Sequence, residues 1–136
     1  MKLLKFILLA TLVLTVQGIH ARPLKTNSIY MFGFSASFKD SIVYVTDIQN
    51  VQGAWIDTKN KFLMGREHYS SQLNNYLADS LNMPGRVSMV LFATKKKKAE
   101  KLFLKLMKKY KKGYDVRYIN ATQFKFEAID SDPEEE

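Results

Sequence analysis

Hydrophobic and polar positions alternate in the first part of the chain in the way that β-strands require. In Ser28–Phe38 every second residue is aromatic or alanine, and Ile42–Ile48 resumes the alternation with β-branched residues. The short polar break between the two runs predicts an antiparallel hairpin. The next stretch, 49–65, mixes apolar residues with a glycine and a polar tetrapeptide, which favours short extended pieces around a turn.

Two later segments repeat their apolar residues at intervals of three and four, the spacing of an amphipathic helix. The first segment is Arg66–Leu81, and a proline and a glycine follow it. The second follows Thr94, a residue type that caps helices, and ends near Gly113. At 100° per residue its apolar positions span an arc of about 140°. They are Ala99, Leu102, Phe103, Leu106, Met107 and Tyr110.

Three further strands complete the expected fold. Val87–Ala93 is apolar except for one serine, which is typical of a central strand that is covered on both faces. Tyr114–Ile119 and Phe124–Ala128 are the last two predicted strands. The order ββαβαββ predicts an α+β domain of two layers, in which two amphipathic helices cover one face of a mainly antiparallel sheet.

The first residues of the chain have the pattern of a secretory signal peptide. Lys2 and Lys5 supply positive charge, and Phe6–Val16 is a run of eleven uncharged residues. Such a run is too short to span a bilayer. The small residues Gly18 and Ala21 follow it and provide cleavage sites.

This pattern sets the expected organisation of the chain. We expect 1–21 to be removed, 22–129 to form one domain, and 130–136, which contains five acidic residues, to be a disordered tail. No later segment is apolar for long enough to place a transmembrane helix in the mature chain. We therefore expect an exported protein that is periplasmic or extracellular.

Positive charge is concentrated on the second predicted helix. The chain has a formal net charge of +8, and Lys95–Lys112 contains ten lysines and a single acid, Glu100. Eight of these lysines fall opposite the apolar arc, so the helix can pack on the sheet and still present them outward. They are Lys97, Lys98, Lys101, Lys105, Lys108, Lys109, Lys111 and Lys112.

These lysines favour an anionic partner in the cell envelope, such as lipid head groups, lipopolysaccharide or an acidic glycan. Nucleic acid is disfavoured, because the sequence contains no recognition motif for it. The alternative is a solvated helix face that contributes only solubility. The oligomeric state is left open by the sequence.

Residue types that are absent exclude several chemistries. The chain has no cysteine, which excludes disulfides, cysteine zinc sites, iron–sulfur clusters and a cysteine nucleophile. Its six glycines stand alone, so there is no phosphate-binding loop, and neither a zincin nor a calcium-loop motif is present. We expect no cofactor and no metal, and we assign no catalytic residue.

We expect a non-catalytic, exported binding or interaction module whose basic helix face meets an anionic envelope partner. The alternative is a small cell-envelope hydrolase that uses His68 or paired carboxylates. His68 stands beside Glu67 and two serines, but consecutive helix positions point in different directions, so the spacing forms no triad. The scattered carboxylates are Asp40, Asp47, Asp57, Glu67 and Asp79. An enzyme should bring at least two of His68, Asp47, Asp57 and Glu67 into one concave pocket.

The aromatic residues allow two interpretations. Tyr30, Phe32, Phe34 and Phe38 share one face of the first predicted strand, where we expect them to fill the core beneath the helices. Tyr44 and Trp55 are candidates for an exposed aromatic groove that would bind carbohydrate or peptide, if the other sheet face is open to solvent.

Three short motifs carry a resemblance to known proteins: Val45-Thr-Asp-Ile-Gln, Ala54-Trp-Ile-Asp and Phe62-Leu-Met-Gly-Arg. With them, most of the mature chain resembles small exported, functionally uncharacterised proteins of Gram-negative anaerobic bacteria. That resemblance implies a periplasmic or extracellular location and no particular activity.

A second likeness is confined to 87–126. There a strand ending in Phe92-Ala93, a helix with Ala99-Glu100, and a strand after Gly113 resemble half of a SPOR domain. This likeness implies a further alternative, a SPOR-like module that binds peptidoglycan.

Overall fold

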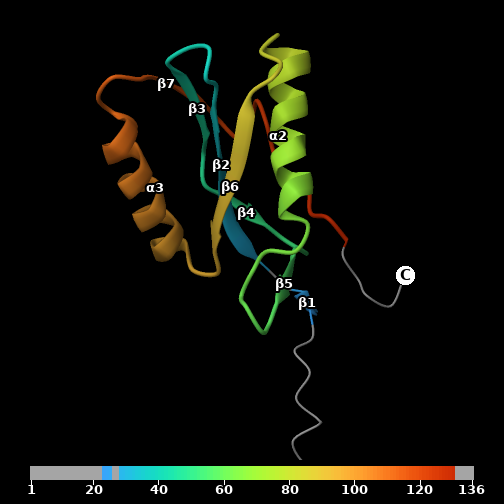
Figure 1. Cartoon of the computed structure of the whole chain (residues 1–136). Helices are drawn as coiled ribbons and strands as arrows, with labels where there is room; N and C mark the ends of the chain where they lie inside the picture. The colour runs from blue at the N-terminus through green and yellow to red at the C-terminus, as the bar shows by residue number, and fades with distance from the viewer. Residues whose placement is uncertain (1–22, 26–27, 131–136) are drawn as a thin grey trace, which may run out of the picture.

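The computed structural model describes residues 23–25 and 28–130 (Figure 1). The predicted signal peptide and all but the first residue of the predicted tail lie outside these residues. The elements, in chain order, are β1 (Pro23–Lys25), β2 (Ile29–Ala36), β3 (Ile42–Thr46), β4 (Gln49–Val51), β5 (Trp55–Asp57), α2 (Arg66–Ser80), β6 (Val87–Ala93), α3 (Lys96–Tyr110) and β7 (Asp115–Ile119). The fold is α+β, as predicted.

Strand β2 is the centre of the main sheet. It pairs antiparallel with β6 along one edge and with β3 and β4 along the other, and the register shifts by one residue between β3 and β4, as at a β-bulge. The predicted β2–β3 hairpin is thereby confirmed. Strand β7 extends the sheet by pairing in parallel with β3, so the sheet is mixed. A separate two-stranded sheet consists of β1 and β5.

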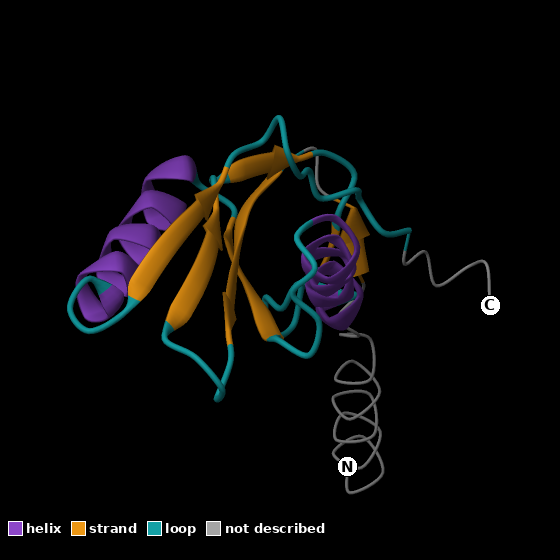
Figure 2. Cartoon of the chain, turned by 90° about the horizontal axis from the view of Figure 1, so that it is seen from above, coloured by secondary structure: helices purple, strands orange, loops and turns teal. Residues whose placement is uncertain are grey.

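The two helices cover opposite faces of the main sheet, so the prediction that both cover one face was wrong (Figure 2). On one face, Met31 of β2 packs in a cluster with Leu73 of α2. On the other face, Phe34 of β2 packs in a second cluster with Leu106 of α3. The layers are therefore α3, the curled sheet and α2.

The physical reason lies in the small residues of β2. Gly33 and Ser35 alternate with the aromatic residues and resemble a solvent face, yet Ser35 is fully buried. A Cβ atom built on Gly33 would lie 2.6 Å from Cδ2 of Leu73. The small residues thus make room for α2 and do not face water.

Strand β6 lies at an edge of the sheet, so its prediction as a central strand was wrong. Val87 is 61% exposed and Met89 is 42% exposed. The next side chains of β6 are apolar because a helix covers each face of the strand: Val90 packs toward α2 and Leu91 toward α3. The Arg66 side chain of α2 covers the edge at one point, where its Nε donates to the Val90 carbonyl at 2.8 Å.

Residues 124–128 form no strand, although the sequence predicted one there. Two glutamine side chains take the place of a partner strand. The Gln49 amide donates to the Phe124 carbonyl (2.9 Å) and accepts from the Phe126 N–H (2.8 Å). The Gln72 amide likewise donates to the Glu127 carbonyl and accepts from the Glu127 N–H, at 2.9 Å each. These bonds hold the segment in an extended path outside the sheet.

The Tyr69 hydroxyl fixes the end of the same segment by accepting a hydrogen bond from the Ile129 N–H at 3.0 Å. Burial raises the pKa of Tyr69, and this hydrogen bond opposes the shift only in part. Tyr69 is fully buried and its ring packs edge-on against Phe126, so the segment completes the core on the α2 face.

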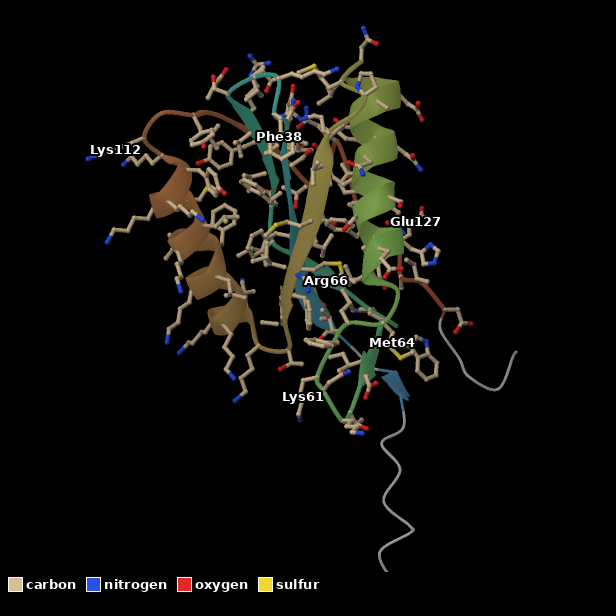
Figure 3. All side chains as sticks on the ribbon, in the orientation of Figure 1. Phe38, Lys61, Met64, Arg66, Lys112 and Glu127 are labelled. Carbon is tan, nitrogen blue, oxygen red and sulfur yellow. The ribbon has the colours of Figure 1, made fainter. Side chains whose placement is uncertain are left out.

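Three finer expectations have mixed outcomes. Phe32 and Phe34 are buried against α3 as predicted, but Phe38 lies beyond the end of β2 and is fully exposed (Figure 3). Thr94 does not cap α3, because Lys95 occupies the cap position and makes no side-chain capping bond. Within the described residues, no helix combines the length and apolar character that crossing a membrane requires.

Candidate functional site

A cleft of about 770 Å³ opens between the first three turns of α3, the end of β6 and the loop after β5. Four lysines line it together with apolar and small residues. We call it the lysine cleft. Its lining residues are Ile56, Thr58, Lys61, Phe92, Ala93, Thr94, Lys98, Lys101, Leu102 and Lys105.

One wall of the cleft is a helical stripe. Lys98, Lys101, Leu102 and Lys105 follow the spacing i, i+3, i+4 and i+7, which places them on one side of α3. Leu102 stands at the margin of the apolar arc, where the arc meets the lysines. It is 37% exposed, because it faces the cleft and no side chain covers it fully.

The opposite wall carries Lys61 on a tight turn (Figure 3). The Asp57 carboxylate accepts the Lys59 N–H at 2.8 Å, and the Asp57 carbonyl accepts the Lys61 N–H at 2.8 Å. Lys61 itself has a φ of 62°, a left-handed conformation that is uncommon for a residue with a side chain. The turn thus fixes where the Lys61 side chain begins, across the cleft from α3.

The charged residues that line the lysine cleft are all positive. Its lining includes four lysines and no carboxylate. The ion pairs among the described residues join Arg86 to Asp40 and Arg117 to Asp115, so none of them neutralises a cleft lysine. Like charges that share one opening repel each other, and an anion placed between them would remove that repulsion.

The start of α3 adds to this positive field. Lys95–Lys98 stand at the N-terminal end of the helix, and its first turn has no acidic residue and no side-chain cap. A cation there opposes the helix dipole and costs about 0.3–1 kcal/mol. Helix stability therefore does not explain the lysines at this end.

The structure divides the eight lysines that the sequence singled out. Lys98, Lys101 and Lys105 line the cleft, and the other five are exposed elsewhere on α3 or just after it. The cleft residues that sequence reasoning missed are Lys61, Ile56, Phe92 and Leu102 as a surface residue. The stripe at 98, 101, 102 and 105 was visible in the sequence, but its juxtaposition with the β5 loop depends on the tertiary fold.

The two candidate groove aromatics lie apart from the cleft lining. Tyr44 is buried, and the Arg86 guanidinium lies over its ring at 5.0 Å from the centroid. Arg86 is held by Asp40 and by the Ile42 carbonyl, so Tyr44 offers no exposed face to a ligand. Trp55 is half-buried in β5, next to the cleft residue Ile56.

The candidate catalytic residues do not line the cleft either. His68 and Glu67 are exposed on the first turn of α2. The carboxylates of Asp47 and Asp57 accept backbone N–H groups, from Ala121 at 3.1 Å and from Lys59 respectively. In the described part of the chain, no group of three or more His, Asp or Glu residues could hold a metal ion.

Chemically, the lysine cleft can hold an anionic group at its rim and apolar groups on its floor. No protein-family model, curated protein or solved structure matches the chain.

Proposed function

We propose that this protein is a non-catalytic binding module that holds an anionic partner in the lysine cleft, between α3 and the loop after β5. The observation that carries the proposal is the convergence of four lysines from two separate elements on one cleft without a carboxylate in its lining. An anion bound there would interact with several ammonium groups at once. Lysine ammonium groups are compact point charges, so they suit carboxylate, phosphate and sulfate groups alike.

The partner that fits best is an anionic component of the cell envelope: a lipid head group, lipopolysaccharide or an acidic glycan. This part of the proposal depends on export to the periplasm or the cell exterior, which rests on the sequence pattern of 1–21. Nucleic acid fits less well, because the cleft lining has no arginine and the chain has no recognition motif.

The two alternatives have less support. A hydrolase would need a reacting pair in a concave site, and none of His68, Asp47, Asp57 and Glu67 lines the cleft. A SPOR-like module would bind peptidoglycan with the segment 87–126, which includes α3. Sedimentation with purified peptidoglycan tests that alternative directly.

Cosedimentation with lipid vesicles tests the main proposal. The protein should bind vesicles that contain phosphatidylglycerol, should be released as the salt concentration rises, and should not bind pure phosphatidylcholine. A triple variant, Lys98→Gln, Lys101→Gln and Lys105→Gln, removes three cleft charges. It should weaken binding by about ten-fold or more. Lipopolysaccharide and an acidic polysaccharide serve as parallel probes.

A second triple variant is the matched control. Lys97→Gln, Lys108→Gln and Lys111→Gln remove the same charge from the same helix region but lie outside the cleft lining. This variant should retain most of the binding. The proposal fails if the parent protein binds no anionic probe, or if the cleft variant binds as tightly as the parent.

A chain that lacks 130–136 should bind the anionic probes more tightly than the full chain, because the five acidic residues that compete with them are gone.

A further inference from the structure

The floor of the lysine cleft is apolar and incompletely covered. Ile56 and Phe92 belong to the margin of the core on the α2 face, and Leu102 extends from α3 into the cleft. Isolated exposed leucines are common on protein surfaces. Here, however, the exposed leucine lines one concavity together with Ile56 and Phe92, and the Arg66 guanidinium lies 5.6 Å from the centroid of the Phe92 ring. Several apolar residues in one concavity are typical of a small-molecule site.

The rim above this floor is cationic on both sides. Lys61 stands on one side, and Lys98, Lys101 and Lys105 stand on the other. Lysine side chains lay their methylene stems along apolar surface and keep the ammonium group at the water boundary. The cleft therefore has a hydrocarbon interior and a positively charged opening, which is the complement of a molecule with an apolar chain and an anionic head.

From this complementarity we propose that the lysine cleft binds a single-chain anionic amphiphile as a free molecule, with its chain on the floor and its head group between Lys61 and the α3 lysines. The volume of about 770 Å³ is in the range of small-ligand sites, roughly 300–1,000 Å³. A flat bilayer surface could meet the lysines at the rim of the cleft but would leave the floor uncovered. The inference rests on the proposed function and names the ligand class for its site.

A series of alkyl carboxylates tests the proposal by isothermal titration calorimetry. Octanoate, decanoate and dodecanoate share one head group, and all are used below their micelle-forming concentrations. Each methylene that enters the cleft should tighten binding by about four-fold, because burying a methylene group is worth about 0.8 kcal/mol. Acetate should not bind measurably, and an uncharged alkyl maltoside with the same chain as decanoate should bind at least about ten-fold more weakly.

Two leucine variants locate the chain. Leu102→Gln should flatten the dependence of affinity on chain length, whereas Leu104→Gln, at a 66% exposed position outside the cleft lining, should leave it unchanged. Both positions are exposed enough for the fold to tolerate glutamine, and circular dichroism melts verify this. Equal effects of the two variants would overturn the placement of the chain.

One lysine variant locates the head group. Lys61→Asn removes the charge with a residue type that tolerates a left-handed backbone, so the turn is retained. It should weaken every alkyl carboxylate by a similar factor and leave the chain-length dependence intact. An unchanged affinity would refute the head-group position.

The outcomes separate this inference from the proposed function. One outcome is that anionic vesicles bind in a salt-sensitive way, while the affinity for alkyl carboxylates does not depend on their chain length. That outcome would overturn the amphiphile proposal and leave the anion-binding function standing. If neither the vesicles nor the carboxylates bind, both proposals are wrong.

Discussion

A close approach between α2 and the sheet offers a direct test of the packing. At Gly33 of β2, an added Cβ would lie 2.6 Å from Cδ2 of Leu73, 3.1 Å from Cζ of Phe126 and 3.5 Å from Cγ2 of Thr46. Leu73 is fully buried and Phe126 nearly so, which leaves little space into which they could move. Gly33→Ala therefore has to displace packed side chains.

The expected magnitude follows from two opposing effects. Overpacking a core by a methyl group costs about 1–3 kcal/mol. Replacing glycine by alanine also restricts the unfolded chain, which restores about 0.4–1 kcal/mol where the backbone is compatible. We expect Gly33→Ala to lower the free energy of unfolding by about 1–2 kcal/mol, measured by urea denaturation with an unchanged m-value.

A double-mutant cycle identifies the cause. Leu73→Ala alone should cost about 2–5 kcal/mol, because it leaves a cavity in the core. The methyl group of Ala at 33 would partly occupy that cavity, so the double variant should be at least about 1 kcal/mol more stable than the sum of the single effects predicts.

Leu77→Ala is the matched control for this cycle. Leu77 is fully buried one turn further along α2 and is not among the nearest atoms to the added Cβ. Its effect should add to that of Gly33→Ala. A neutral Gly33→Ala, or additive behaviour with Leu73→Ala, would show that α2 does not approach β2 in the way described.

Three further stability predictions use the same denaturant assay. Leu106→Ala, in the cluster between α3 and the sheet, should lower the free energy of unfolding by about 2 kcal/mol or more. Leu104→Ala, on the exposed side of α3, should lower it by less than about 1 kcal/mol. Equal losses would contradict the orientation of α3. Lys95→Asp should stabilise α3 by about 1 kcal/mol relative to Lys95→Ala, because it supplies the missing cap and an acid at the positive end of the helix. Asp40→Asn should cost about 2 kcal/mol, because it removes the carboxylate that neutralises buried Arg86, and an effect near zero would show that the pair contributes nothing.

Local periodicity was a sound guide to the elements. It placed β2, β3, α2, β6, α3 and β7 within a few residues of their observed bounds. It could not decide which helix meets which face, because a glycine or serine on a strand has the same pattern whether it faces water or a closely packed helix. Gly33 and Ser35 have the pattern of residues that face water, but they face α2.

Two other errors also come from tertiary contacts. The apolar run of β6 indicates helices on both faces and contains no information about neighbours in the plane of the sheet, so an edge strand was predicted as a central one. The segment 124–128 has the alternation of a strand, but its backbone partners are amide side chains from distant positions. Sequence alone could find the lysines of the candidate site on α3; it could not bring Lys61 to them.

The glutamine contacts of this segment have a consequence for local opening. In a β-ladder, each broken hydrogen bond leaves its neighbours in place, whereas here one rotation of the Gln49 side chain releases the backbone at both Phe124 and Phe126. A rotation of the Gln72 side chain releases both backbone groups of Glu127 in the same way. Two side-chain rotations thus free most of the backbone of the segment, which should detach while the sheet stays intact. In native-state hydrogen exchange, the Phe126 and Glu127 amides should exchange together, at a lower opening free energy than the amides of β2. Such opening would expose the aromatic core beside Tyr69 without unfolding the domain.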